Sequence, residues 1–291
     1  MRIITEVVKN LSQIREDWER LLLESDTATV FQAPAWVNAW QNYFILGVYD
    51  EGKLVGVGVF EERDKKIIFG AMHGLADFGD IVAQRGREQE VWQQILKHLR
   101  MTYNVSSIML DFVREESPSF EVLSKLGKIR LQEVAPQIDV PRSWENYLLS
   151  LGRKKRHELK RKMRQVKGEI MVIEKISDKD ADRFIELVKG SSEEKRRFMD
   201  PEMEIFFRKI VKLGKLFALG DMAMVLGFEW KNNWYLYNSG YMGSGVGIAL
   251  FGMIIEQAIK SKIERVDFLR GNERYKYDLG AVDKKLYNME V

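Results

Sequence analysis

The architecture of this chain can be read from one stretch, which begins Trp234-Tyr235-Leu236-Tyr237-Asn238-Ser239-Gly240-Tyr241 and continues through Gly243-Ser244-Gly245-Val246-Gly247 into an apolar segment at residues 248–259. The first part reads as a strand and the last as a helix. Three glycines at alternate positions before a helix leave backbone N–H groups uncovered and facing one way. With the positive end of the helix dipole, these donors predict a site for a phosphate or pyrophosphate.

Composition bounds the kind of protein. A chain of 291 residues exceeds the usual size of one core, so we expect two domains. The absence of cysteine excludes disulfides, cysteine-ligated zinc and thiol catalysis. Only three histidines occur, and they are scattered, so we expect no metal site. The formal net charge is +3, so local clusters of charge matter more than the total.

Nothing in the sequence predicts a membrane span. The longest apolar stretch, residues 248–259, is interrupted by Gly252, Glu256 and Gln257. Residues 1–6 lack the charged-then-apolar order of a signal peptide. We therefore expect a cytoplasmic protein.

The two halves of the chain share a plan. Each has hairpin-linked strands, then a loop, a helix and a closing strand. In the first half these are expected at residues 44–49, 54–60, 67–69, 88–100 and 107–113. In the second half they are expected at residues 216–219, 223–230, 234–241, 247–260 and 265–269.

Further helices are expected before each set of hairpins. In the first half they span residues 14–23 and 34–43, and in the second half 144–167, 179–189 and 201–213. Pro136 and Pro141 bracket a short extended piece between the halves. We therefore predict an α/β protein with mixed sheets and two domains, residues 1–138 and 139–291.

The glycine loop by itself leaves several interpretations open. A strand-to-helix turn that merely needs small residues is the plainest one. The loop lacks the Lys-Ser/Thr of a nucleoside-triphosphate loop, and it lacks the acidic residue and parallel strands of a Rossmann unit. Hairpins that lead into a glycine loop, a helix and a parallel-type strand resemble the core of GNAT acyltransferases. In that family the loop holds the pyrophosphate of an acyl-CoA. The predicted donor contacts are Tyr241, Gly243, Gly245, Val246 and Gly247.

Three motifs sharpen this resemblance. The most specific is Asp267-Phe268-Leu269-Arg270-Gly271-x-Glu273-x-Tyr275-Lys276, which is similar to the signature of CelD-like acetyltransferases in the FemAB-related group of GNAT proteins. Phe31-Gln32-Ala33-Pro34-Ala35-Trp36 with Trp40, and Lys154-Lys155-Arg156-x-x-x-Lys160-Arg161, also resemble motifs of that family. One departure is Gly245-Val246-Gly247, where relatives often have Ser-Pro-Gly.

The resemblance implies tandem GNAT-like domains with one acyl-donor site, in the second domain. The first half fits this asymmetry because residues 77–82 contain no glycine-rich loop. The implied co-substrate is an acyl-CoA, such as acetyl-CoA, and the implied activity is transfer of its acyl group to an amine.

The residues that follow the last strand could carry this chemistry. Transfer to an amine needs a base, and Asp267 or Glu273 could accept the proton. Tyr275 or Tyr277 could donate a proton to the departing sulfur, a role that the resemblance to GNAT enzymes implies for a tyrosine. Arg270 and Lys276 could pair with phosphates or with a substrate carboxylate. The alternative is a structural network in which Asp267 and these cations hold the final strands together.

The segment 153–167 is strongly basic, with nine Lys and Arg residues against Glu158 alone. Most such runs are solvated faces, and Leu159, Met163 and Val166 provide only a narrow apolar stripe, which suits a basic helical hairpin. Repulsion between the cations favours an anionic partner. A tRNA, a nucleotide-linked sugar or an anionic lipid surface would supply the charge.

For the acceptor we predict contacts from Asp77, Asp80 and Arg156. Its expected identity, an amino sugar or its nucleotide-linked form from a cell-envelope or polysaccharide precursor, rests on the resemblance. Two alternatives stay open. One is a Fem-type aminoacyltransferase that uses aminoacyl-tRNA as donor. The other is a non-catalytic binding protein in polysaccharide assembly that keeps the fold.

Overall fold

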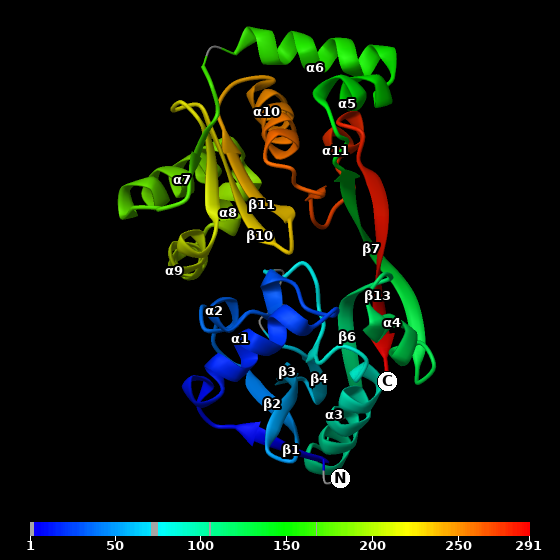
Figure 1. Cartoon of the computed structure of the whole chain (residues 1–291). Coiled ribbons are helices and arrows are strands. Elements are labelled where there is room, and N and C mark those ends of the chain that lie inside the picture. Colours follow the sequence, from blue (N-terminus) through cyan, green and yellow to red (C-terminus); the bar gives the residue numbers. More distant parts are fainter. Residues whose placement is uncertain (1–2, 71–74, 105, 167) are drawn as a thin grey trace. The chain divides into compact units, whose positions relative to one another are not determined.

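The computed structural model describes residues 3–70, 75–104, 106–166 and 168–291 (Figure 1). Contacts divide the chain into unit 1, Met1–Glu133 with Lys284–Val291, and unit 2, Val134–Asp283. The predicted boundary after residue 138 lies slightly beyond this division. The last residues, predicted to belong to the second domain, group with unit 1. The boundary falls within two strands, β7 (Lys128–Asp139) and β13 (Val282–Glu290).

Unit 1 contains a mixed sheet with the order β1-β2-β3-β4-β6-β13. The pair β4–β6 is parallel, and β5 adds to β3. The strands are β1 (Ile3–Val8), β2 (Phe44–Asp50), β3 (Lys53–Arg63), β4 (Lys66–Phe69), β5 (Val82–Ala83) and β6 (Ser107–Arg114). The helices are α1 (Arg15–Glu24), α2 (Pro34–Val37), α3 (Glu88–Thr102) and α4 (Pro118–Leu123).

The apolar residues of helix α3 recur on one face, and this face packs against the sheet of unit 1. Val91, Trp92 and Ile95 are fully buried. The helix lies directly on β3, since a Cβ added at Gly56 would be 2.3 Å from Val91 Cγ1. The predicted helix at residues 88–100 and the hairpin at 44–60 are therefore confirmed.

One prediction for unit 1 is wrong, and two strands were missed. The helix expected at residues 34–43 ends at Val37, because the chain turns after it and Asn42 adopts a positive φ of 62°. Strands β1 and β13 were not predicted. The buried residues of β13, Leu286 and Met289, do not alternate, and the strand pairs with β6, which lies far away in the sequence. Such pairing leaves little local signal.

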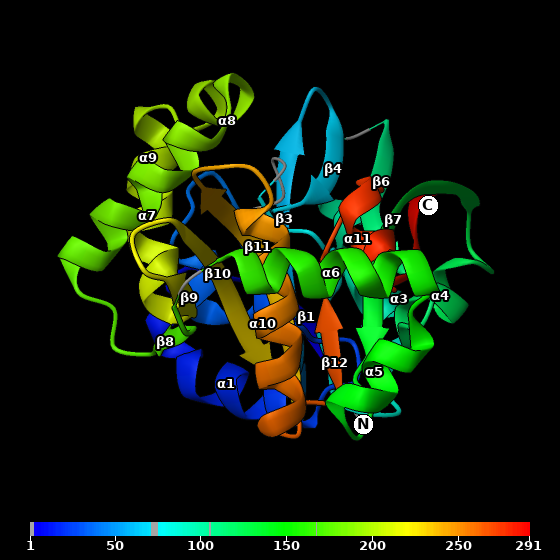
Figure 2. The ribbon, with the colours of Figure 1, turned by 90° about the horizontal axis from the view of Figure 1, so that it is seen from above.

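In unit 2 the strands of the mixed sheet have the order β8-β9-β10-β11-β12-β7, in which β11 and β12 are parallel. Helices α7 and α10 lie on opposite sides of β10 and β11 (Figures 1 and 2). The further strands are β8 (Met171–Ile173), β9 (Lys215–Leu219), β10 (Ala223–Trp230), β11 (Asn233–Tyr241) and β12 (Arg265–Asp267). The helices are α5 (Trp144–Ser150), α6 (Arg153–Gln165), α7 (Asp178–Ser191), α8 (Glu193–Phe198), α9 (Pro201–Ile210), α10 (Val246–Lys260) and α11 (Arg274–Asp278).

Helix α6 is seated on α10 by the predicted apolar stripe, and Figure 2 shows it crossing that helix. A Cβ added at Gly252 of α10 would lie 2.7 Å from Leu159 Cδ1 and 3.0 Å from Met163 Sδ. Glycine therefore permits the close approach of the two helices. Most Lys and Arg side chains of α6 are exposed, whereas Leu159 is buried against α10.

The single helix predicted at residues 144–167 is two helices. Leu151 and Gly152 separate α5 from α6, because Leu151 is buried in the core and Gly152 has the extended backbone of an N-cap. Helix α6 ends before Val166, and Lys167 lies outside the described residues. The helices predicted at residues 179–189 and 201–213 are confirmed, the latter ending in a 3₁₀ turn.

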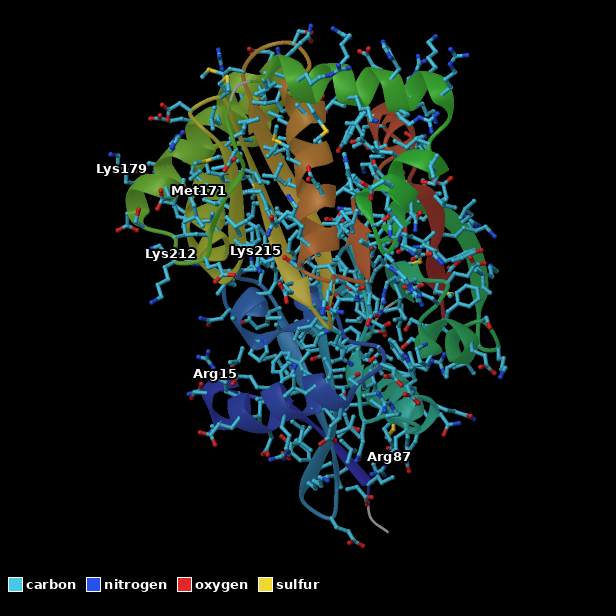
Figure 3. The ribbon with its side chains drawn as sticks, turned by 45° about the horizontal axis from the view of Figure 1, so that its top comes forward. Arg15, Arg87, Met171, Lys179, Lys212 and Lys215 are labelled. Carbon is cyan, nitrogen blue, oxygen red and sulfur yellow. The ribbon has the colours of Figure 1, made fainter. Side chains whose placement is uncertain are left out.

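The outer surface of unit 2 is charged. Lys179 and Lys212 point away from the sheet in Figure 3. Lys212 Nζ lies 2.6 Å from Asp178 Oδ1, an exposed pair of the kind that contributes little to stability. Within the described ranges, no helix is long and apolar enough to cross a membrane.

Candidate functional site

The glycine loop leads from the end of β11 to the start of α10. Gly243 and Gly245 have positive φ angles of 95° and 80°, which glycine adopts without strain. Gly245 is the N-cap of α10, and among the described residues no side chain caps this helix and no acidic residue occupies its first turn. The first amides of α10 can therefore donate to an anion, and the helix dipole favours it.

A cavity of about 370 Å³, here called the α10 cavity, opens at this end of the helix. It brings predicted donor contacts together with predicted catalytic residues. The lining residues are Lys162, Lys195, Ser239, Tyr241, Gly245, Gly247, Ile248, Phe251, Glu273 and Tyr275. Tyr241, Gly245 and Gly247 thus share one cavity with Glu273 and Tyr275, although about thirty residues separate the two groups in sequence.

Tyr275 is held by aromatic contacts. Its ring stacks on Phe251 at 5.1 Å between centroids and meets the edge of Phe268 at 6.2 Å. Burial raises the pKa of the Tyr275 hydroxyl, and the nearby Glu273 and Tyr241 raise it further. The hydroxyl therefore stays protonated at neutral pH and can donate a proton or a hydrogen bond into the cavity.

Glu273 lies at the N-cap position of α11 and is substantially exposed. Its carboxylate lies 3.0 Å from Lys276 Nζ. This ion pair restrains the side chain at the rim of the cavity. In this position the Glu273 carboxylate can accept a proton or bind a cationic group.

Lys276 is buried and bonded to the preceding turn. Its Nζ donates to the carbonyl oxygens of Leu269 at 3.1 Å, Arg270 at 2.6 Å and Gly271 at 3.1 Å. Leu269 itself has a positive φ of 58°, an unfavourable conformation for a branched residue. These bonds give Lys276 a structural role, and the geometry does not support its predicted contact with substrate.

Asp267 belongs to the same turn. Its Oδ1 accepts the backbone N–H of Leu269 at 2.7 Å, and the side chain is buried. Asp267, Arg270 and Lys276 are absent from the described residues that line the α10 cavity. The structure therefore places Asp267 as a support for the strained turn, whereas its predicted catalytic role has no geometric support.

Lys195 of α8 was not predicted as a site residue. Its Nζ donates to the carbonyl oxygen of Ser239 and lies 5.8 Å from the centre of the Tyr241 ring. Burial lowers the pKa of Lys195, while Glu273 and Glu194 oppose this shift. In sequence Lys195 belongs to the charged run at residues 193–197, which is typical of a solvated face, so no local signal marks it.

The bond from Lys195 lies along an open edge of β11. Within the described chain, β12 pairs with β11 only through Asn233–Tyr235, and the rest of β11 continues without β12 beside it. The strand predicted at residues 265–269 ends at Asp267, because the turn of Leu269 diverts the chain. An extended ligand could therefore bind beside β11, between this edge and Tyr275.

The other predicted acceptor contacts lie elsewhere. Asp80 of unit 1 is buried and accepts from Ile81 N at 2.8 Å and from the hydroxyls of Ser117 and Ser119, each at 2.5 Å. This network commits its carboxylate to the interior of unit 1. Asp77 is also buried there. Arg156 of α6 lies outside the α10 cavity, and its guanidinium is 3.5 Å from the carbonyl of Leu148.

Comparison with known families bears on this half of the chain. Residues 153–277 match the family described as Acetyltransferase (GNAT) domain. The matched segment contains the glycine loop, α10 and the Glu273–Tyr275 motif. The CelD-like resemblance is thereby confirmed at the level of a GNAT domain.

Solved structures support the tandem architecture. FemX is 11% identical with a TM-score of 0.66, covering 99% of this chain and 97% of that one. L-PGS from Bacillus licheniformis is 11% identical with a TM-score of 0.66, covering 94% of this chain and 90% of that one. A tandem GNAT protein from the clavulanic acid biosynthesis pathway is 11% identical with a TM-score of 0.54, covering 99% and 98%.

Because the sequence identities are only 11%, the similarity to these structures establishes the fold and nothing further. The chain has mixed α/β architecture of the tandem-GNAT kind, as predicted. No curated protein sequence matches it significantly.

Proposed function

We propose that this protein is an N-acyltransferase that moves an acyl group from an acyl-CoA to an amine. One observation carries the proposal. The N-terminus of α10, with its positive-φ glycines, opens into the same cavity as Glu273 and Tyr275. A pyrophosphate donor and an acid–base pair can therefore meet in one site, as acyl transfer from a thioester requires.

In the proposed reaction, the first amides of α10 hold the pyrophosphate, and the pantetheine arm extends along the open edge of β11. The amine attacks the thioester carbonyl, forming a C–N bond and breaking the C–S bond. Glu273 accepts the proton lost by the amine. Tyr275 supplies a proton to the departing thiolate, a role that suits its protonated hydroxyl.

For the acceptor we propose an amino sugar or its nucleotide-linked form. This choice rests on the resemblance to CelD-like proteins. The open rim at Glu273, whose side chain is 59% exposed, leaves room for an amine to approach from solvent.

Calorimetric titration with acetyl-CoA and CoA tests the donor. Gly245→Asp places a carboxylate where the pyrophosphate would lie, and aspartate tolerates a positive φ better than most residues. We expect wild type to bind and the variant not to bind. Gly190→Asp is the matched control, because Gly190 is exposed on α7 and has open space around it. Failure of wild type to bind either ligand would overturn the proposal.

A second candidate is a Fem-type aminoacyltransferase with aminoacyl-tRNA as donor. The row of exposed cations on α6, which includes Lys154, Lys155 and Arg161, favours it. Such binding should weaken steeply as salt is raised, and charge reversal at these three positions should abolish it. Filter binding of tRNA at two salt concentrations tests this alternative.

A non-catalytic role in polysaccharide assembly is the remaining alternative. It expects that Tyr275→Phe and Asp267→Asn leave the cellular role intact. Complementation of a deletion strain with the Tyr275→Phe variant separates this alternative from the proposed N-acyltransferase, since an enzyme that uses Tyr275 as an acid would lose activity.

A further inference from the structure

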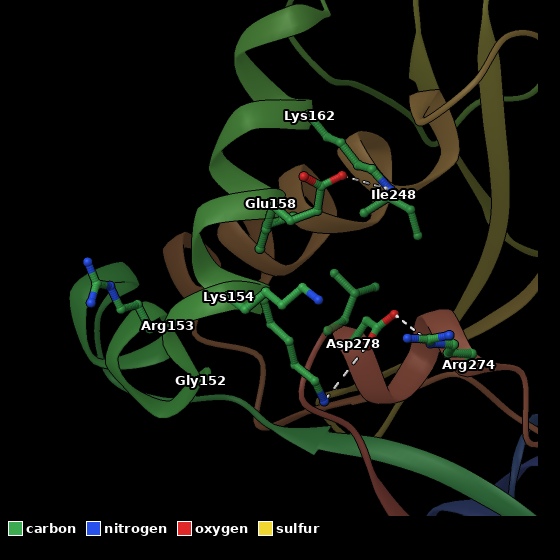
Figure 4. Close-up of a pocket in the computed structure, with 11 residues that line it drawn as sticks. Gly152, Arg153, Lys154, Glu158, Lys162, Ile248, Arg274 and Asp278 are labelled. Atoms are coloured by element: carbon green, nitrogen blue, oxygen red, sulfur yellow. Dashed lines mark ion pairs between the residues drawn. The ribbon is translucent and has the colours of Figure 1, made fainter.

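A second cavity of unit 2, here called the α6 pocket, has a volume of about 760 Å³. The first half of α6 forms one wall, and α11 with Ile248 of α10 forms the other (Figure 4). This volume is in the range of cavities that bind nucleotide-sized molecules. All of its lining residues belong to unit 2.

The α6 pocket is rich in cations. Its lining includes Arg153, Lys154, Lys155, Lys162 and Arg274, against the two carboxylates of Glu158 and Asp278. The carboxylates are shared. Asp278 lies 3.9 Å from Lys155 and 3.7 Å from Arg274, and Glu158 lies 3.6 Å from Lys162 and 2.6 Å from Arg161. The local positive charge is therefore only partly compensated.

Lys154 is the cation best placed for a ligand. Figure 4 shows its side chain directed into the pocket, whereas Arg153 points away from it. Within the part of the chain that the structure describes, no ion pair or hydrogen bond engages the Lys154 ammonium. Arg274, on the facing wall, is almost fully exposed and can also reach an anion.

The position of these cations in α6 is unfavourable without an anion. Arg153, Lys154 and Lys155 form the first turn of the helix, and no acidic residue occupies that turn. Cations at a helix N-terminus oppose the helix dipole and repel one another. A bound phosphate would relieve both effects. If these cations only faced solvent, their position in the first turn would bring no benefit.

The pocket also has an apolar floor. Leu159 and Leu279 are nearly completely buried, and Ile248 lies between the two cavities. Aliphatic side chains beside a cluster of cations suit a phosphorylated nucleoside, whose base needs an apolar surface and whose phosphate needs charge.

The α6 pocket and the α10 cavity adjoin one another, because Lys162 and Ile248 line both. The aliphatic part of Lys162 passes beside the glycine loop, since a Cβ added at Gly245 would lie 3.5 Å from Lys162 Cγ, Cδ and Cε. One extended molecule can therefore hold a pyrophosphate at the N-terminus of α10 and a second phosphate in the α6 pocket.

We infer that the α6 pocket binds the phosphorylated nucleoside end of the acyl donor, with Lys154 and Arg274 on its 3′-phosphate and the base on Leu159 and Ile248. The inference rests on the proposed acyl-CoA function and adds a specificity to it. CoA carries such a 3′-phosphate, and 3′-dephospho-CoA is the same molecule without it.

The test compares these two ligands by calorimetric titration of the full chain. We expect wild type to bind CoA about tenfold more tightly than 3′-dephospho-CoA, the loss typical of one charge-assisted phosphate contact. Replacing Lys154 and Arg274 together by Gln should remove this difference and leave the affinity for 3′-dephospho-CoA unchanged. Lys160→Gln is the control, because it removes a charge from α6 outside the pocket.

Equal binding of CoA and 3′-dephospho-CoA by wild type would overturn this inference while leaving the proposed function intact. Failure to bind either ligand would overturn both. A parallel titration with tRNA tests whether the phosphorylated nucleoside that binds in the pocket belongs to RNA and not to CoA. Binding of tRNA without binding of CoA would assign the α6 pocket to RNA and overturn its assignment to CoA.

Discussion

The carboxylate of Glu273 lies 3.0 Å from the ammonium of Lys276, which is only 2% exposed and also bonds the carbonyls of residues 269–271. The rim of the α10 cavity and the strained turn after β12 are thus joined through one buried cation. This relationship divides the cluster at residues 267–276 into a structural support, Lys276 with Asp267, and a reactive rim, Glu273 with Tyr275.

Lys276→Met should destabilise unit 2. The substitution leaves the carbonyls of the 269–271 turn without their donor, and breaking a buried polar network of this kind costs about 3 kcal/mol in the free energy of unfolding. Urea denaturation measures this cost. Glu273→Gln, the matched change at the exposed end of the pair, should alter stability by less than about 1 kcal/mol. Equal stability of Lys276→Met and wild type would refute the structural role.

Tyr275→Phe should leave the fold intact and slow acyl transfer. The ring contacts with Phe251 and Phe268 are kept, whereas the proton donor for the thiolate is lost, so kcat should fall about 100-fold. Steady-state kinetics of CoA release measures this effect. Tyr277→Phe serves as the control, because Tyr277 donates to Asp283 outside the cavity. Unchanged kcat in Tyr275→Phe would exclude Tyr275 as the acid.

Lys195 should make donor binding sensitive to pH. Its lowered pKa means that the ammonium loses its proton at a lower pH than an ordinary lysine, so the positive charge beside Tyr241 disappears as pH rises. Affinity for CoA should therefore decrease on the alkaline side. Titrations of wild type and of Lys195→Met with CoA, from neutral to alkaline pH, provide the measurement. A decrease of the same size in the variant would show that another group is responsible.

Asp80 should give unit 1 a distinctive dependence on pH. Burial raises its pKa from 3.8 to about 6, although Arg114 and hydrogen bonds from Ser117 and Ser119 lower it. Between these values the folded chain binds more protons than the unfolded chain, so this group's contribution to stability is full at low pH and is lost as pH rises through about 6.

The free energy of unfolding of wild type relative to Asp80→Asn should thus decline by about 2 kcal/mol between pH 4 and pH 7. Chemical denaturation of both proteins at several pH values measures the difference. A difference that stays constant, or that grows with pH, would contradict the raised pKa.

Much of the site could be predicted from local sequence. The glycine loop needs positive φ angles at Gly243 and Gly245, and alternate glycines before an apolar run identify such a loop without further information. Glu273 and Tyr275 belong to one short sequence motif, and the structure places both at the start of α11. Helices α3, α7 and α10 were predictable because their apolar residues recur at helical spacing.

Tertiary structure decided the remainder. Lys195 enters the cavity only because α8 packs near the open edge of β11, and in sequence it looks like any surface lysine. The sequence left open whether Lys276 and Asp267 react or support the chain, and burial with the positive φ of Leu269 decides for support of a turn. Similarly, β13 pairs with β6 across more than 170 positions in the chain. The sequence alone thus determined the local conformations that backbone sterics dictate. Which side chains share a cavity depended on burial and long-range packing, and only the folded chain defines these.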